Sequence, residues 1–440
     1  MKVSNWGKYP VVDGPVQQYA PGQLINGQSS WIPRGMGRCY GDASLGERMI
    51  GSQRLNRFLA FDPQTGILTC ESGLTYEDLL RVMVPKGWFP PVTPGTKFVS
   101  LGGALASDVH GKNHHTEGSI SQYVHHFQLL TAKGEVLNCS RTEHPDVFWA
   151  TLGGMGLTGM ILSLSIRLKP IQTSAINSIS SKAGNLEEIM ALMDETKAAT
   201  YSVAWIDTVS GGKRQGRSIL SYGEHASLEE VQGTPWEKDP LRLPAAKAIA
   251  VPIDFPAFVL NPWSIGAFNF LYYHKQLKKE VHKISSYDPF FYPLDNIHHW
   301  NRVYGKRGFT QYQLVIPRSA GKTVIPDILN RMRKARLGSF LSVLKLMGNE
   351  TQMLSFPLAG YTLTLDFPIS DKLFPFLDTL DRLLLDCGGR IYLTKDVRLS
   401  GESLKKMYPD LPKFQQVIRE LDPYGYIRSL QSQRLNIHST

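Results

Sequence analysis

The sequence has no run of about 20 apolar residues, which a membrane-spanning helix would need. Its longest apolar stretch, from Ala248 to Tyr273, is interrupted by three prolines and by Asp254. Because proline interrupts a helix, we exclude a continuous spanning helix there. The pattern favours a loop buried over a core; the alternative is a flap that contacts a lipid tail or a membrane surface.

Cysteine is scarce and forms no metal or redox motif. There is no C-x-x-C pair, and the four residues are scattered along the chain: Cys39, Cys70, Cys139 and Cys387. This usage is typical of free thiols in a reducing compartment. The first residues, MKVSNWGKYPVVDG, lack the apolar core of a signal peptide. We therefore expect a cytoplasmic protein, or one that lies peripherally at the inner membrane face.

Acidic residues are fewer than basic ones, and the formal net charge is +10. Basic runs occur at His274–Lys283 and Arg331–Arg336. Such runs are usually solvated helix faces, although they can also attract phosphates or anionic lipid. No nucleic-acid-binding module is recognisable, so we expect no nucleic-acid partner.

The first 170 residues are rich in glycine and predict short strands with loops and a few helices. The segment from Leu74 to Gly87 predicts a helix, because Thr75 and Asp78 have capping-box spacing ahead of an apolar face. A hairpin is predicted over residues 123–140, followed by a short helix from Pro145 to Gly153.

After about residue 175 the predicted strands are longer and more aromatic, as in YSVAWIDTV, GFTQYQLVIP, YTLTLDFPI and GRIYLTKDVRL. Helices are predicted between them, at Lys322–Arg336 and Asp371–Cys387. This mixture predicts an α+β fold in which an antiparallel sheet is covered by helices. We expect two domains, residues 1–172 and 173–404, with the segment from about 405 to 440 returning to the first.

The segment GMGLTG, from Gly154 to Gly159, matches the G-x-G-x-x-G pattern of dinucleotide-binding folds. That motif needs a strand before it, a helix after it and an acid about 20 residues further on. Here the predicted helix comes first, a strand follows, and residues 174–184 contain no acid. The context therefore excludes a Rossmann-type site.

Two other glycine-rich loops are candidates for phosphate binding: Pro33–Asp42, and the loop that begins at Thr93 and runs through GGALASDVHGKNHHTEGS. Glycines let a backbone approach a ligand closely, and successive N–H groups can hold an anion, although tight turns explain such loops equally well. A metal site at HGKNHH is disfavoured, because Gly111 breaks the helix that would align His110 with His114. We expect no metal.

Motifs in both halves carry a family resemblance. They are RGMGRCYGD, PVTPGTKFVSLGGALASDVHGKNHHTEGS, LLTAKGEVL, FWATLGGMGLTGMI, SFLSVLKLMG, LDFPI, GRIYLTKDVR and MYP. In this order the chain resembles the PCMH-type FAD-binding proteins of the vanillyl-alcohol-oxidase superfamily, and within it the decaprenylphosphoryl-β-D-ribose 2-oxidase family. The likeness extends from Arg34 to about Pro409.

The resemblance implies FAD in the first domain and substrate against the second. Many members bond the flavin to a histidine in the first glycine loop; this sequence has Tyr40 there, which implies noncovalent FAD. The implied cofactor-binding residues come from several loops: Arg34, Gly35, Met36, Gly37, Arg38, Cys39, Tyr40, Gly41, Pro94, Gly95, Thr96, Gly102, Gly103, Ser107, Gly111, Asn113, His114, Gly118, Gly156, Gly159, Ile161, Tyr392 and Lys395.

Strand alternation places Thr362, Thr364 and Asp366 on one face, and likewise Gln311 with Gln313 and Leu393 with Lys395. A polar stripe in mid-strand either faces water or lines a pocket. The resemblance implies the pocket, with Gln311, Gln313, Lys345, Thr362 and Thr364 as substrate-binding residues.

By the same resemblance, Lys395 is the first candidate catalytic residue, followed by His110 and Tyr40. Lys395 serves either as a base with a lowered pKa or as a protonated electrostatic anchor. Where mycobacterial-type members have a cysteine and an asparagine, this chain has Thr364 and Thr362. Reagents that trap that thiol are therefore expected to fail here.

The resemblance implies oxidation of the 2-hydroxyl of a polyprenyl-phosphate-linked ribose to a 2-keto intermediate. A separate short-chain NAD(P)H-dependent keto-reductase would then complete epimerisation to the arabinose form. The alternatives are an FAD-dependent oxidase of free sugars, alditols or aldonolactones, and a flavin-free binding protein that keeps only the fold.

Overall fold

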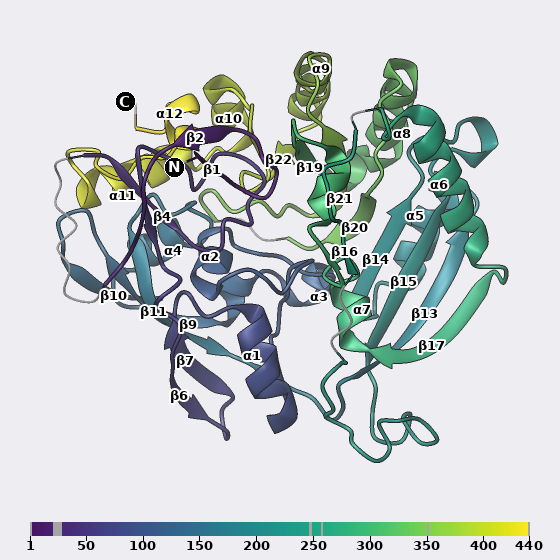
Figure 1. Ribbon diagram of the computed structural model, residues 1–440, viewed down its shortest axis with the longest axis horizontal. Helices are drawn as coiled ribbons and strands as arrows, with labels where there is room; N and C mark the ends of the chain where they lie inside the picture. The colour runs from purple at the N-terminus through teal and green to yellow at the C-terminus, as the bar shows by residue number, and fades with distance from the viewer. Residues whose placement is uncertain (1, 21–28, 246–248, 257, 350–351, 439–440) are drawn as a thin grey trace.

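The structure is a computed structural model that describes residues 2–20, 29–245, 249–256, 258–349 and 352–438. It has an α+β fold with a sheet in each half of the chain (Figure 1). The first sheet has the order β10-β9-β11-β7-β6 and pairs antiparallel throughout. Its strands are β6 (Phe58–Asp62), β7 (Ile67–Glu71), β9 (Val124–Leu130), β10 (Val136–Ser140) and β11 (Met160–Arg167).

Helices α1 (Tyr76–Met83), α2 (Leu101–Ala106) and α4 (Pro145–Thr151) accompany this sheet. Thr75 and Asp78 form the predicted capping box at the start of α1, and β9 and β10 form the predicted hairpin. The GMGLTG segment lies between α4 and β11, so its context is helix then strand, as expected. Further short elements lie in this half: β1 (Lys2–Ser4), β2 (Val11–Asp13), β3 (Val16–Gln18), β4 (Trp31–Arg34), β5 (Arg48–Gly51), β8 (Trp88–Phe89), α3 (His114–Glu117) and β12 (Lys169–Pro170).

The second sheet is antiparallel and has the order β17-β13-β15-β14-β20-β21-β19-β22. Its strands are β13 (Ala175–Ala183), β14 (Tyr201–Ile206), β15 (Ser218–His225), β17 (Glu280–Ser286), β19 (Phe309–Pro317), β20 (Ser342–Met347), β21 (Gly360–Pro368) and β22 (Arg390–Ile391). The proposed domain boundary at 172/173 falls between β12 and β13.

One face of this sheet is apolar and packs against α5 (Leu186–Glu195), α8 (Arg318–Ala335) and α9 (Leu373–Asp386). Leu363 and Leu365 of β21 point into that core and are fully buried. Successive strand residues point to opposite faces, so Thr364 and Asp366 face the other way. The alternation predicted for β21 is confirmed, and it leaves a polar face toward the first half of the molecule.

The C-terminal helices lie beside the N-terminal strands (Figure 1). They are α10 (Gly401–Met407), α11 (Leu411–Leu421) and α12 (Leu430–Arg434). Trp31 of β4 pairs with Ile427, and Arg434 donates to the carboxylates of Asp42 and Asp396 at 2.8 Å each. Because Asp42 and Asp396 each follow a predicted site loop, α12 fixes those two loops relative to one another. These contacts support the proposal that the C-terminal segment returns to the first domain.

Two expectations are wrong. GRIYLTKDVRL was predicted to be a strand, but only Arg390–Ile391 is one. The chain then turns, since Lys395 N–H donates to the Tyr392 carbonyl at 3.0 Å and Asp396 N–H to the Leu393 carbonyl at 3.2 Å. Lys395 therefore lies in a turn, and its place in the site does not follow from strand alternation with Leu393.

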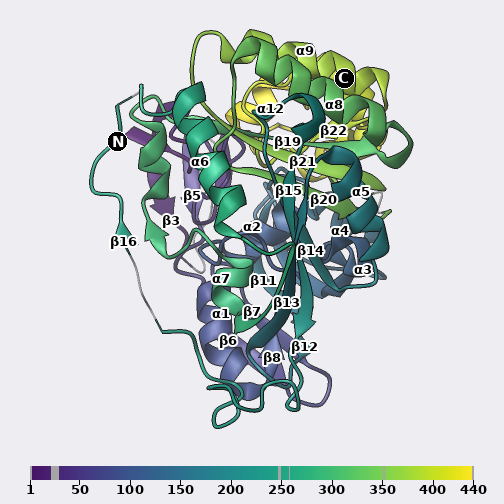
Figure 2. The same ribbon diagram turned by 90° about the vertical axis from the view of Figure 1, so that its right-hand side faces the viewer.

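The apolar stretch from Ala248 to Tyr273 is also not a buried loop; Ala248 itself lies outside the described residues. The stretch contains β16 (Ile249–Ala250) and most of α6 (Pro262–Lys275), which starts with a proline at a position where no N–H donor is needed. Trp263 is 88% exposed and Phe258 76%. Figure 2 shows α6 alongside the strands of the second sheet. The segment between α6 and β19 contains β17, α7 (Tyr287–Phe291) and β18 (Ile297–His298).

Candidate active site

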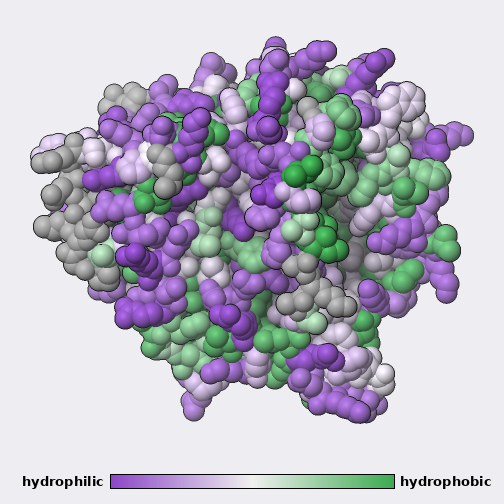
Figure 3. Space-filling view, viewed as in Figure 1, coloured by the Kyte–Doolittle hydropathy of each residue, from purple (hydrophilic) through white to green (hydrophobic). Residues whose placement is uncertain are grey.

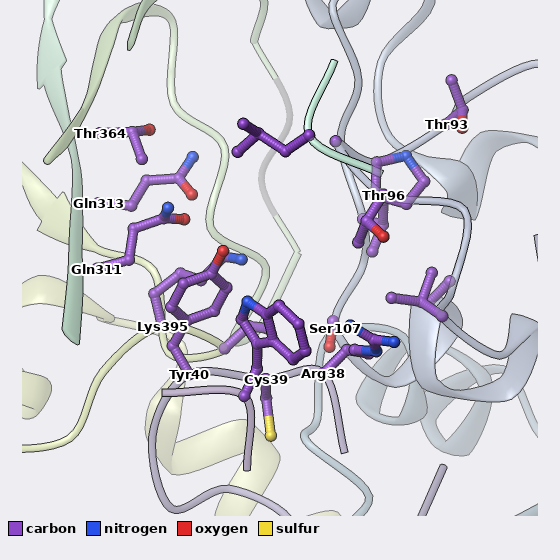
Figure 4. A pocket seen from close by; sticks show the side chains of 18 of the residues that line it. Arg38, Cys39, Tyr40, Thr93, Thr96, Ser107, Gln311, Gln313, Thr364 and Lys395 are labelled. Carbon is purple, nitrogen blue, oxygen red and sulfur yellow. The ribbon is translucent and has the colours of Figure 1, made fainter. Parts of the chain in front are cut away.

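A cavity of about 960 Å³ lies between the glycine-rich loops of the first half and the polar face of the second sheet. This volume is at the upper end of the range for ligand pockets in proteins. Figure 4 shows polar side chains on both of its walls: Gln311, Gln313 and Thr364 from the sheet, and Thr93 and Thr96 from a loop opposite.

Most of the residues predicted for the cofactor line this cavity: Arg34, Gly35, Met36, Gly37, Arg38, Cys39, Tyr40, Pro94, Gly95, Thr96, Gly102, Gly103, Ser107, Gly111, Gly156, Gly159, Ile161, Tyr392 and Lys395. Gly37 has φ +63°, a conformation that side chains other than glycine rarely adopt. The Arg38 guanidinium lies 4.2 Å from the centre of the Trp6 ring, which holds its charge at the wall. Arg34 instead donates to the Ser4 and Ser44 carbonyls and so secures the loop.

Four predicted cofactor residues do not line the cavity. Gly41 allows a close approach of two loops, because a Cβ there would lie 1.7 Å from the Asp396 carbonyl oxygen. Asn113 donates its amide to the Pro91 carbonyl at 2.7 Å, and His114 Nδ1 accepts from Gly348 N–H at 3.0 Å. Gly118 ends α3. These residues shape the loops around the cavity.

Of the substrate-binding residues predicted on the sheet, all but Thr362 line the cavity. Gln311, Gln313, Lys345 and Thr364 line the cavity. Thr362 is fully buried, and its hydroxyl accepts a hydrogen bond from the Gln313 amide at 3.3 Å. Thr362 therefore orients Gln313 from behind.

Lys395 and Tyr40 come together because their loops pack on one another, with Tyr40 N–H donating to the Thr394 carbonyl at 3.2 Å. The Lys395 ammonium lies 3.9 Å from the centre of the Tyr40 ring. Burial lowers the pKa of Lys395 to about 8, against the opposing effect of the Asp366 carboxylate. Burial also raises the pKa of Tyr40 well above its usual value, so this phenol stays neutral.

Asp366 is fully buried behind this pair of residues. Its carboxylate accepts from the Gln311 amide at 2.6 Å and from the Tyr304 hydroxyl at 3.3 Å. Burial raises the pKa of Asp366 to about 7, although Gln311, Lys395 and Tyr304 oppose that rise. Lys395 is partly exposed, so it can contact substrate, whereas the buried Asp366 acts on Lys395 through its charge.

His110 lines the cavity in its neutral form, because burial and the nearby Lys345 lower its pKa well below 6.5. Its Nε2 lies 2.8 Å from the Gln313 amide nitrogen, which can only donate. His110 therefore carries its hydrogen on Nδ1. That buried atom has no hydrogen-bond partner within the described residues.

Several cavity residues were not predicted as site residues, although the sequence carried signals for some. Asp366 shares its strand face with Thr364, and Lys112 lies inside the HGKNHH segment. An apolar end of the cavity was missed altogether: Val203, Trp205, Ile219, Phe268 and Tyr272. There α6 covers the sheet, with the Trp205 and Tyr272 rings 4.7 Å apart. The i, i+4 spacing of Phe268 and Tyr272 was the available signal.

The glycine loops and the cavity that they border have the form of an FAD site, and residues 26–140 match a family model described as an FAD binding domain. Fold and site therefore define an FAD-dependent oxidoreductase. The chain is 37% identical over 415 residues to a decaprenylphosphoryl-β-D-ribose oxidase of Mycolicibacterium smegmatis, covering 92% of this chain and 89% of that protein. It belongs to the family of FAD-dependent oxidases that includes that enzyme.

Two further relatives extend over most of the chain. A Streptomyces coelicolor protein described as uncharacterized is 30% identical over 374 residues, which are 83% of this chain and 100% of that protein. The L-gulonolactone oxidase of Mus musculus is 24% identical over 394 residues, 86% of this chain and 82% of that enzyme.

The residues present fit FAD. A dinucleotide needs backbone that it can approach closely. At the cavity wall the space beside the Cα of Gly95 is open, since a Cβ placed there would meet nothing within 4 Å, so a ligand can contact this backbone. The orphaned Nδ1 of His110 and the ammonium of Lys395 add polar groups near the junction of the two halves. The loops Arg34–Tyr40 and Pro94–Gly103 would hold the cofactor, with Lys395 at the end next to the sheet.

Proposed function

We propose that this chain oxidises the 2-hydroxyl of a polyprenyl-phosphate-linked ribose to a 2-keto product. The observation that carries the proposal is the shape of the cavity. It continues from the glycine loops, past the polar side chains of β19 and β21, to the apolar end beneath α6. A polar sugar and an apolar chain on one substrate match these two environments. The similarity to the mycobacterial oxidase supports the same substrate class.

FAD, when bound, supplies the acceptor for the hydride that leaves the carbinol carbon. The protein has to position that carbon and take the hydroxyl proton. Gln311, Gln313 and Thr364 offer hydrogen bonds to sugar hydroxyls from adjacent strands. Lys395 either takes the proton in its neutral form, or remains charged and stabilises the negative charge that develops on the cofactor.

The proposed catalytic residues are Lys395, His110 and Tyr40. Neutral His110, held by Gln313, can orient a substrate hydroxyl but is a weak base because its pKa is so low. Tyr40 contributes its ring beneath the Lys395 ammonium. We also propose that FAD is bound noncovalently, since Tyr40 occupies the loop position at which related proteins carry the linking histidine.

A peripheral contact with the membrane surface would give the enzyme access to a lipid substrate. Large apolar side chains are exposed around α6 and β16: Ile249, Ile253, Phe258, Trp263, Phe270, Leu271 and Leu277. Figure 3 shows apolar residues among hydrophilic ones on the side of the molecule where α6 lies. Lys275 and Lys278 are exposed beside them, the combination found at interfacial membrane-binding segments. In the described part of the chain no helix is long and apolar enough to cross a bilayer.

The membrane contact is tested with the holoenzyme and sedimented vesicles. Vesicles of anionic lipid should bind the protein, and Trp263→Ser together with Leu271→Ser should release most of it. Leu59→Ser, at an exposed apolar residue of β6, is the control and should bind like wild type. Equal binding of all three proteins would contradict the proposal.

A separate short-chain NAD(P)H-dependent keto-reductase is the proposed partner. Oxidation at the 2-position removes that stereocentre, and a hydride delivered to the opposite face would give the arabinose form. The segment Gly154–Gly159 lacks the strand-then-helix context of a nicotinamide cofactor site, so we assign the reduction to another protein.

Mass spectrometry tests the proposed reaction. The holoenzyme incubated with a polyprenyl-phosphate ribose should produce a species that is lighter by two hydrogens. Free ribose, an alditol and an aldonolactone serve as competing substrates. A preference for any of these would contradict the proposal and favour an oxidase of small polar substrates, the class to which the L-gulonolactone oxidase similarity also points.

A further inference from the structure

Four of the five lysines in the cavity lining have no acidic partner within the described residues; Lys275 and Lys283 are exposed, whereas Lys112 and Lys345 are largely buried. Lys345 of β20 makes neither a hydrogen bond nor an ion pair with its ammonium there. Lys112 donates to the Phe290 carbonyl, and its ammonium lies 4.4 Å from the centre of the Phe290 ring. A lysine ammonium has three donors, so Lys112 keeps two for a ligand.

The electrostatic setting of this pair differs from that of Lys395. Burial, together with the charge of Lys345, lowers the pKa of Lys112 to about 7. Burial also lowers the pKa of Lys345 to about 8. Lys395 has the Asp366 carboxylate to offset its burial, whereas no carboxylate offsets the burial of Lys112 and Lys345. Two neighbouring cations kept out of water without a counter-charge form a site that an anion would stabilise.

The pair also lies at a defined place along the cavity. Lys345 is paired with Thr362 of β21, on the sugar side of the sheet. The Lys112 carbonyl accepts from Ser202 N–H of β14 at 2.9 Å, next to Val203 of the apolar end. On β20, Val343 precedes Lys345 on the same face and is paired with Trp205. The backbones of the two lysines therefore lie between the polar and the apolar parts of the cavity, and the Lys112 side chain extends from there to Phe290 of the lining.

We propose that Lys112 and Lys345 form a phosphate-ester subsite that holds the phosphate between the sugar and the apolar chain of the substrate. This inference rests on the proposed function, because it assigns one part of the substrate to one part of the cavity. The loops expected to hold the cofactor, Arg34–Tyr40 and Pro94–Gly103, contain neither of these lysines. The subsite explains how the enzyme distinguishes a sugar phosphate ester of a lipid from a free sugar.

Anion binding is expected to take up protons. A bound phosphate ester favours the charged form of each lysine, so the pKa of each rises on binding. Between its free and bound pKa values a lysine gains a proton on binding, and affinity therefore falls as the pH rises above about 7 to 8. A purely steric role for these side chains would produce no proton uptake.

Binding of farnesyl phosphate to the holoenzyme tests the subsite, with farnesol as the uncharged counterpart. Affinity is measured by perturbation of the flavin absorbance, and proton uptake by calorimetry at pH 8 in two buffers of different ionisation enthalpy. We expect farnesol to bind at least tenfold more weakly than farnesyl phosphate. Lys112→Met and Lys345→Met should each lower the affinity for farnesyl phosphate at least tenfold but change the affinity for farnesol less than twofold.

Lys182→Met is the matched control. Lys182 also donates to a backbone carbonyl, that of Gln276, and lies 4.2 Å from the centre of the Tyr273 ring, but it is outside the cavity lining. This variant should bind both probes like wild type. Lys345→Arg, which keeps the charge, should retain most of the affinity for farnesyl phosphate. Unchanged flavin content in each variant shows that the fold and the cofactor site are intact.

The outcomes separate this inference from the proposed function. The subsite is overturned if the Met variants lose affinity equally for farnesol and farnesyl phosphate. It is also overturned if farnesyl phosphate binds to wild type without proton uptake. Inorganic phosphate that competes with farnesyl phosphate in wild type, but not in the double Met variant, supports it. A third outcome is that the Met variants lose farnesyl phosphate binding but the wild-type holoenzyme does not oxidise lipid-linked ribose. This outcome contradicts the proposed function and leaves the subsite standing.

Discussion

Replacing Lys395 with methionine is expected to stabilise the fold near neutral pH while it removes most of the activity. Burial lowers the pKa of Lys395 from 10.5 to about 8. Since each pKa unit corresponds to about 1.4 kcal/mol, holding this ammonium in its charged form costs roughly 3 kcal/mol of folding free energy. Methionine fills a similar volume without the charge. The loss of the charge should lower kcat about a hundredfold or more, as for other removed electrostatic groups.

The contact of Lys395 with the Tyr40 ring reduces the gain in stability. A partly desolvated cation over an aromatic ring contributes about 1 to 2 kcal/mol, and the variant loses that contribution. A net gain of about 1 to 2 kcal/mol therefore remains at pH 7. Between pH 8 and 10.5 the unfolded wild-type chain binds more protons at this site than the folded chain, so wild-type stability rises with pH in that window. The advantage of the variant should shrink over the same window.

Denaturant unfolding of Lys395→Met and wild type at pH 7 and pH 10 measures both quantities. The change in the stability difference between variant and wild type from pH 7 to pH 10 reports proton linkage, separately from the effects of side-chain volume and flavin affinity. Lys405→Met, at an exposed lysine of α10 outside the cavity lining, is the control and should behave like wild type at both pH values. A stability difference that is the same at both pH values, or wild-type turnover in Lys395→Met, would refute the reasoning.

Two further predictions concern the same site. Asp366→Asn removes the carboxylate that raises the pKa of Lys395, so the limb of the pH–rate profile that reports Lys395 should move to lower pH. A limb that rises with pH identifies Lys395 as the base, a falling limb identifies it as a protonated anchor, and a limb that stays in place contradicts the coupling. Acid precipitation of the protein should leave the flavin in the supernatant, because Tyr40 cannot form a histidyl link; flavin that stays in the pellet would disprove noncovalent binding.

Local patterns predicted much of the secondary structure. Thr75 and Asp78 start α1, and the alternation of YTLTLDFPI assigns the two faces of β21, because capping and strand pleating depend only on residues close in sequence. Most of the cofactor and substrate residues that the family motifs implied also line the cavity. These signals are local, or they are carried by motifs whose spacing is fixed.

The position of Lys395 shows where local patterns fail. Alternation in GRIYLTKDVRL predicted a strand, but its backbone hydrogen bonds close a turn onto the loop of Tyr40. That packing depends on Gly41, on the Asp396 carbonyl and on Arg434 from the far end of the chain. No window of the sequence contains all of these contacts.

The sequence by itself determined the class of this protein: the resemblance of its motifs to a known family implies an FAD-dependent oxidoreductase, and its strand and helix patterns predict an α+β substrate half. Only the tertiary structure decided which charges meet. It placed Asp366 behind Lys395, left Lys112 and Lys345 together without a carboxylate, and turned the apolar side chains of α6 outward. The physical reason is that pKa and exposure depend on neighbours brought together by folding across hundreds of residues, which composition and periodicity do not encode.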